Sequence, residues 1–155
     1  MTFNNEKILV LGLGKDICGD DAIGLVLLQR LKEKFTGKNP NLDFIETTLS
    51  GLSLIDFLVG YEKVIILDAI QMGSEEGTIH KFVVDKEHSS FAAIAASPHF
   101  SGIHEIFHFG HKISDDFPKI IVILAVEISK LYEISEKLSP NLENILGSLI
   151  DSASK

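Results

Sequence analysis

The sequence is poor in cysteine, in basic residues and in long apolar runs, and each shortage excludes a class of protein. Cys18 is the single cysteine, which excludes a fold held together by intrachain disulfides. The 14 Lys and Arg residues are outnumbered by 22 Asp and Glu residues, and the formal charge is −8 at pH 7. Because no run of basic residues is present, we expect neither nucleic acid nor an anionic membrane surface as a partner.

Targeting segments are also missing. The amino terminus lacks the apolar core of a signal peptide, and no apolar run approaches the ~18 residues of a transmembrane helix. We therefore expect a cytoplasmic protein with no membrane partner, acting as a monomer. The 155 residues, 45% of them hydrophobic, are enough for a single domain over residues 1–155 with a sizeable core.

Apolar patterning predicts strands that alternate with helices. Continuous apolar runs at 7–13, 64–67 and 120–126 indicate strands buried on both faces of a parallel sheet. A short strand at 42–46 and an alternating edge strand at 78–84 complete the sheet, and helices are predicted at 20–35, 52–58, 103–110 and 139–150. This order predicts an α/β fold of three layers, in which helices flank both faces of a twisted, mostly parallel sheet.

Acidic side chains follow two of the buried strands. Asp20 and Asp21 come after the strand at 7–13, and Asp68 stands at the end of the strand at 64–67. Since the carboxyl ends of parallel strands share one sheet edge, we expect these residues to lie close together. We assign Asp20 as the cap of the next helix and Asp21 as a ligand. A carboxylate such as Asp68, partly removed from water, needs an amide partner or a cation.

His99 could bring an imidazole to the same edge. It stands in Ser97-Pro98-His99, a loop before a predicted helix. The set Asp21, Asp68 and His99 suits a divalent metal with open positions, and the imidazole favours nickel or zinc over magnesium or calcium. The alternative is ordinary structural roles: loop amides around Asp68 and a surface position for His99.

Two other catalytic arrangements compete with this one. The stretch His104-Glu105-Ile106-Phe107-His108 is an H-E-x-x-H pattern, which places two histidines on one helix face as in zinc hydrolases, with Glu127 or Glu133 as a third ligand. The simpler interpretation is that His104, His108 and His111 form a solvated flank. Cys18 could form a nucleophilic triad with His99 and Asp68, although a small buried cysteine is the commoner case.

Nucleotide binding is disfavoured. Gly12-Leu13-Gly14 follows a strand as in a dinucleotide-binding loop, but the third glycine of that pattern is replaced by Ile17. Two aspartates at the helix start would also repel a pyrophosphate.

These residues, taken in order, resemble the hydrogenase maturation endopeptidases, which trim the large-subunit precursor of nickel-iron hydrogenases. The resemblance extends over nearly the whole chain. It rests on short motifs whose order and spacing match: Leu11-Gly12-Leu13-Gly14, Asp20-Asp21-Ala22-Ile23-Gly24, Ile66-Leu67-Asp68-Ala69-Ile70, Gly77-Thr78, His99 with Gly102-Ile103 and Glu105, and Leu138-Ser139-Pro140.

The resemblance implies a fold, a site and a substrate. The fold is one twisted sheet flanked by helices, and the metal-recognition residues fall on Asp21, Asp68 and His99. The resemblance also implies that nickel arrives bound to the precursor and that a C-terminal extension is then cut off. It gives Glu105 no zinc role. A metal-binding chaperone without catalytic activity, built on the same scaffold, is the alternative function.

The sequence departs from the family pattern at a few places. Lys15 stands where an asparagine is usual, Thr48-Leu49-Ser50-Gly51 replaces a glycine-rich turn, and Asp21 is shorter than the glutamate of some members. These departures concern the fit of the substrate more than the reaction.

Overall fold

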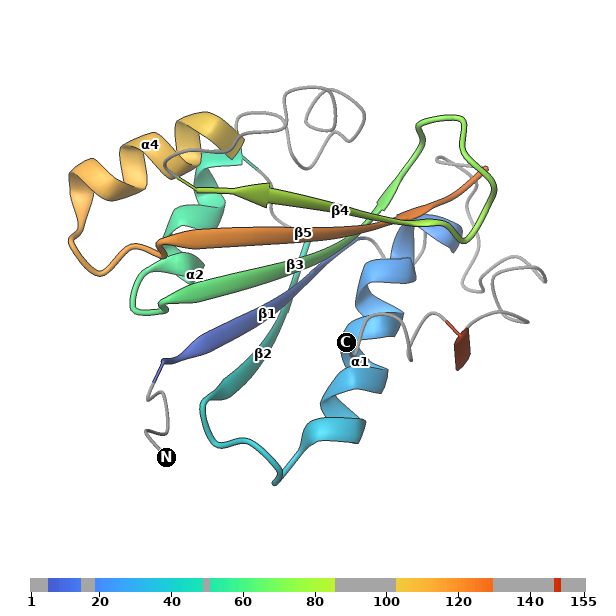
Figure 1. The fold of residues 1–155 in the computed structure, drawn as a ribbon, viewed down its shortest axis with the longest axis horizontal. Coiled ribbons are helices and arrows are strands. Elements are labelled where there is room, and N and C mark those ends of the chain that lie inside the picture. Colours follow the sequence, from blue (N-terminus) through green and yellow to red (C-terminus); the bar gives the residue numbers. More distant parts are fainter. Residues whose placement is uncertain (1–5, 15–18, 49–50, 86–102, 130–146, 149–155) are drawn as a thin grey trace.

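A computed structural model describes residues 6–14, 19–48, 51–85, 103–129 and 147–148; of residues 20, 21, 51, 103 and 104 it describes the backbone alone (Figure 1). These residues contain a five-stranded sheet in the order β2-β1-β3-β5-β4. All pairs are parallel except β4 with β5, which is antiparallel. The strands are β1 (Ile8–Leu13), β2 (Leu42–Thr47), β3 (Lys63–Ile70), β4 (Ile79–Val84) and β5 (Ile120–Glu127).

Helices cover both faces of this sheet. Helix α1 (Ile23–Phe35) lies on one face, whereas α2 (Ile55–Leu58) and α4 (Ile103–Ile113) lie on the other (Figure 1). Short 3-10 turns, η1 (Gly19–Ala22) and η2 (Gly51–Leu54), lead into α1 and α2. The predicted α/β architecture with a mostly parallel sheet is therefore confirmed. None of the helices in the described part of the chain is long and apolar enough to cross a membrane.

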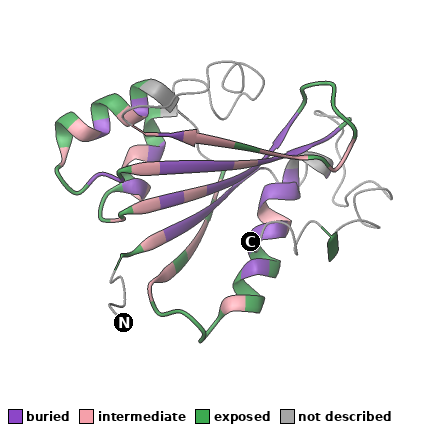
Figure 2. Ribbon diagram, in the orientation of Figure 1, coloured by how far each residue is buried: buried purple, intermediate pink, exposed green. Residues whose placement is uncertain are grey.

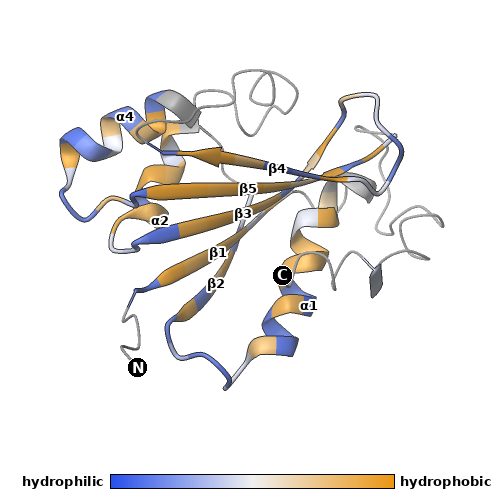
Figure 3. Ribbon diagram, viewed as in Figure 1, coloured by the Kyte–Doolittle hydropathy of each residue, from blue (hydrophilic) through white to orange (hydrophobic). Residues whose placement is uncertain are grey.

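The hydrophobic core has two halves, one on each face of the sheet. The central strands β1, β3 and β5 are buried along most of their length (Figure 2) and are strongly hydrophobic (Figure 3). Alternate residues of these strands enter opposite halves, as the pleat of a strand requires. Leu67 packs with Leu27 of α1, while Ile66 packs with Ile106 of α4.

Several predicted boundaries shift. The helix expected from residue 20 starts as η1, and α1 begins at Ile23 with Ala22 at its N-cap and no capping side chain. The assignment of Asp20 as the cap of α1 is therefore wrong. Strand β3 continues to Ile70, so that Asp68 lies within the strand and not at its end. Most of the predicted last helix, 139–150, falls outside the described residues.

Gly24 sets how closely α1 approaches the sheet. A Cβ atom added to this glycine would fall well inside van der Waals contact with the carbonyl oxygens of Leu13 and Leu67. Both atoms belong to strand backbone, at the end of β1 and within β3, which cannot move aside as a side chain can. Only a residue without a side chain lets α1 start against these two strands.

We predict that Gly24→Ala lowers the free energy of unfolding by about 3 kcal/mol, the upper part of the range for overpacked sites. Urea denaturation of the wild type and the variant measures the difference. Gly147→Ala is the matched control, because a Cβ there meets no atom within 4 Å. An equal change in the two variants would contradict the close approach at Gly24.

Near the amino ends of the strands, Tyr61 links the segment before β3 to β2. Its hydroxyl donates a hydrogen bond of 2.8 Å to Oδ2 of Asp43 on β2. Burial, and after it the hydrogen bond and the negative charge of Asp43, raise the pKa of Tyr61 from 10.0 to about 12. All three causes favour the neutral phenol, which alone can donate to the carboxylate.

Because the pKa is raised in the folded state, this bond contributes its full stability below about pH 10 and loses it as the pH rises towards about 12. We predict that Tyr61→Phe costs about 1 kcal/mol near pH 8 and much less near pH 12. Urea denaturation at the two pH values tests this. A cost that does not change with pH would show that the hydroxyl contributes through packing alone.

Candidate functional site

Asp68 is a buried carboxylate within the central strand. Its side chain is 0% exposed, and its Oδ1 accepts a hydrogen bond of 2.8 Å from the backbone N–H of Ala69. Its neighbours on the same face, Ile66 and Ile70, belong to the half of the core that includes α2 and α4. Asp68 therefore points to the α4 face, close to the carboxyl edge of the sheet. A carboxylate removed from water in this way favours a cation as a partner.

The turn that carries Asp20 and Asp21 lies against the same strand. Turn η1 contacts β3, and Gly24, just after the turn, touches the carbonyl oxygen of Leu67, the residue before Asp68. The structure thus brings the backbone of Asp21 to the edge where Asp68 lies. The close approach of α1 at Gly24 accompanies this placement, because Gly24 comes just after the turn.

His99 and Cys18 lie outside the described residues. The helix that follows His99 is described: α4 begins at Ile103 and packs on the sheet through Ile106, on the face to which Asp68 points. The metal set Asp21, Asp68 and His99, and the alternative triad with Cys18, both remain predictions.

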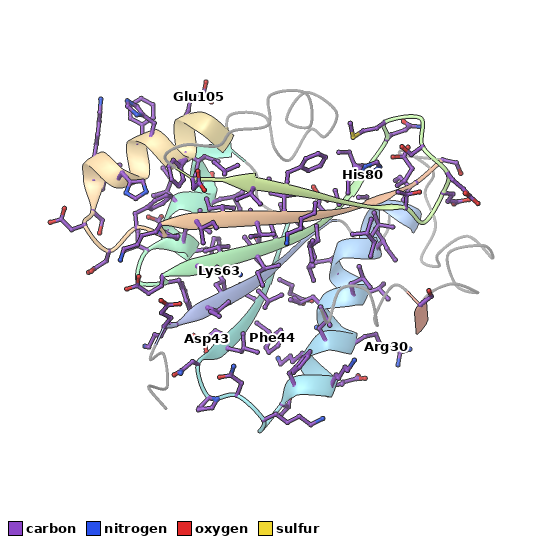
Figure 4. The ribbon with its side chains drawn as sticks, viewed as in Figure 1. Arg30, Asp43, Phe44, Lys63, His80 and Glu105 are labelled. Carbon is purple, nitrogen blue, oxygen red and sulfur yellow. The ribbon has the colours of Figure 1, made fainter. Side chains whose placement is uncertain are left out.

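The H-E-x-x-H stretch does form part of α4, as the sequence predicts, but Glu105 and His108 are exposed. Figure 4 shows Glu105 pointing away from the sheet. Glu127, a proposed third zinc ligand, is bonded to other groups at the far end of β5, and Glu133 lies outside the described residues. Among the side chains that the structure describes, no three His, Cys, Asp or Glu residues form a group able to hold a metal.

His111 corrects the expectation of a solvated histidine flank. Its ring contacts Phe107 and Phe117, with centroid distances of 4.6 and 5.2 Å, and its Nε2 is buried without a hydrogen-bond partner. This histidine is one turn beyond Phe107, so the helical period brings it onto the aromatic packing of α4. His108 remains on the exposed side.

A second buried carboxylate, Glu127, lies at this edge, where the sequence analysis does not expect one. It ends β5 and is 3% exposed. Its Oε1 accepts hydrogen bonds of 2.8 and 2.9 Å from the N–H groups of Met72 and Gly73, and its Oε2 lies 3.0 Å from Nε2 of His80 on β4. A carboxylate after a run of aliphatic residues is the pattern that singled out Asp68, and it could have singled out Glu127 too.

A hollow opens at the same edge of the sheet. It measures about 340 Å³, and the described part of its lining comes from the start of α1 and the carboxyl end of β2: Leu25, Glu46, Thr47 and Thr48. Glu46 accepts a hydrogen bond of 3.1 Å from the side chain of Gln29. The hollow therefore lies on the α1 side of the carboxyl edge, whereas Asp68 points to the α4 side.

Comparison with known proteins decides the family. The family model described as hydrogenase maturation protease matches residues 26–155. The chain belongs to this family. The chain is 23% identical over 153 residues to the hydrogenase 2 maturation protease of Escherichia coli, covering 94% of this chain and 92% of that one. It is 26% identical over 150 residues to the hydrogenase expression/formation protein HupD of Bradyrhizobium diazoefficiens, covering 96% of this chain and 77% of the relative.

Solved structures show the same fold. The hydrogenase maturating endopeptidase HybD from Escherichia coli superposes with a TM-score of 0.73 at 22% identity, covering 95% of this chain and 89% of that one. The [NiFe] hydrogenase maturation protease HybD from Thermococcus kodakarensis gives a TM-score of 0.73 at 20% identity, covering 96% and 97%. The resemblance inferred from the motifs is thus confirmed, and so is the assignment of this maturation protease to the enzymes.

Proposed function

We propose that this maturation protease is an endopeptidase that removes the C-terminal extension of a nickel-iron hydrogenase large-subunit precursor after nickel insertion. The observation that carries the proposal is the buried Asp68 at the sheet edge, with η1 packed beside it, in a chain of this family. Nickel is part of the substrate in this proposal, because it arrives bound to the precursor.

Asp21, Asp68 and His99 are the residues that would contact the ion. A carboxylate pair neutralises charge, and an imidazole fits the preference of nickel for nitrogen ligands. The position of η1 against β3 and the packing of α4 on the face of Asp68 support this set, since they bring the elements that carry or follow the three residues to one end of the sheet.

The three residues act by holding the precursor in place. Once they contact the ion, the polypeptide attached to it is fixed relative to the sheet edge, and the bond to be cut has one allowed position. The ion itself would polarise the carbonyl group of that bond. A protease that recognises its substrate in this way leaves a precursor without nickel uncut.

We predict that the purified protein cuts nickel-loaded precursor and leaves nickel-free precursor at full length, because only the loaded form presents the cation that Asp68 recognises. Mass spectrometry of the precursor before and after incubation measures the cleavage. Equal cleavage of both forms would contradict the role of nickel. No cleavage of either form, with tight binding of the loaded one, would instead indicate the metal chaperone.

We predict that Asp68→Asn and His99→Ala each slow processing of the loaded precursor by about 100-fold, because each loses an electrostatic contact to the ion. Glu105→Gln and His108→Ala are the matched controls, since both residues are exposed on α4 and are not in the proposed set. Single-turnover cleavage compares the four variants with the wild type. The zinc hydrolase would be indicated by the reverse pattern, with loss of activity in the two controls alone.

A further inference from the structure

The further inference concerns His80, which lies in one row with Asp68 across the sheet. In the register of the strands, Asp68 pairs with Ala125 of β5, and Ala125 pairs with His80 of β4. Side chains of paired residues on neighbouring strands point to the same face. Phe82, the next residue on that side of β4, packs in the half of the core that contains Ile66 and Ile70. His80 therefore shares the face of Asp68.

The row is short, and His80 is the end of it that is open to solvent. Two strand spacings separate the Cα atoms of Asp68 and His80, which is roughly 10 Å. The residue between them is Ala125, whose side chain is among the smallest available. Asp68 and Ala125 are 0% exposed, whereas the side chain of His80 is 18% exposed. Figure 4 places His80 on the part of β4 beside the carboxyl ends of β3 and β5.

Glu127 fixes the imidazole of His80. The ionised carboxylate only accepts hydrogen bonds, so the bond of 3.0 Å between Oε2 and Nε2 places the proton of the neutral ring on Nε2. Nδ1 is then the acceptor of the ring. The ring also stacks on Phe82 with 6° between the planes. His80 is thus held in one orientation and one tautomer.

The connection between β3 and β4 is also held by contacts other than the one between Glu127 and His80. The backbone N–H of Gly77 donates to the carbonyl oxygen of Glu127 at 2.9 Å, and the N–H of Glu127 donates to the carbonyl oxygen of Thr78 at 2.8 Å. The other oxygen of the carboxylate, Oε1, holds Met72 and Gly73. Oε2 contacts the histidine and sets the orientation of its ring.

We propose that His80 binds the precursor polypeptide beside the bond to be cut, accepting a hydrogen bond from a peptide N–H, and that Glu127 is a positioning residue that acts through the tautomer of His80. This inference rests on the proposed function. It extends the site from Asp68 across β5 to β4, and it assigns to His80 a contact with the peptide and not with the ion.

Steady-state processing of nickel-loaded precursor tests the proposal through the separate effects on KM and kcat. We expect His80→Leu to raise KM about fivefold, the effect of one lost hydrogen bond, with kcat within about twofold of the wild type. His80→Gln should restore KM, because a glutamine amide can donate to Glu127 and still accept from a peptide. Lys81→Ala is the control, since Lys81 is exposed and lies on the other side of β4.

The variant Glu127→Gln separates an effect on the tautomer of His80 from an effect on folding. Its amide oxygen can still accept from Met72 and Gly73, whereas its NH₂ group now faces Nε2 and moves the ring proton to Nδ1. We expect KM to rise about as much as in His80→Leu, although the connection keeps its bonds. A purely structural role would lower stability and leave the KM of the folded enzyme unchanged.

The outcomes keep this inference apart from the proposed function. Normal KM in both His80→Leu and Glu127→Gln, with processing by Asp68→Asn slowed as predicted above, would overturn the role of His80 alone. If His80→Leu fails to fold, the other two variants still test the role of His80. A normal KM in Glu127→Gln overturns that role. A raised KM in Glu127→Gln, together with a normal KM in His80→Gln, supports it. A wild-type protein that neither cuts nor binds the loaded precursor would overturn both.

Discussion

The close packing of Gly24 against the carbonyl oxygens of Leu13 and Leu67 is the constraint on which the arrangement of the site depends. Helix α1 cannot begin farther from the sheet without losing the burial of Ile23 and Leu27. The turn before α1, η1, therefore lies at the carboxyl edge and contacts β3, the strand that carries Asp68. The backbone of Asp20 and Asp21 thus lies at that edge together with the close packing of α1 on the sheet.

Much of the fold could be predicted from the sequence, because its strongest signals are local. Continuous apolar runs identify β1, β3 and β5, and the alternation of His80, Phe82 and Val84 with their neighbours identifies the edge strand β4. The errors occur where one local rule competes with another. An aspartate before a helix predicts a cap. However, α1 begins only at Ile23, and Asp20 belongs to the 3-10 turn before it.

The site was less accessible to prediction, because its residues are brought together by strand register. The sequence identifies Asp68 through the burial of its strand, which is a local property. The link between His80 and Asp68 depends on β5 lying between β3 and β4, an order that no local pattern specifies. The burial of His111 escapes a local pattern for a similar reason, since Phe117, one of the two rings that it contacts, belongs to the segment after the helix. Function followed from the family resemblance, which combines many weak motifs at once.

The strand order also has a consequence for how the protein is made. Strands β3 and β4 are consecutive in the chain, yet β5 inserts between them and is synthesised about forty residues later. Contacts between segments this far apart form late and slowly during folding. Until β5 takes its place, the row from Asp68 to His80 does not exist. Asp68 and His80 therefore come into one row only after the last strand of the described sheet to be synthesised has been inserted.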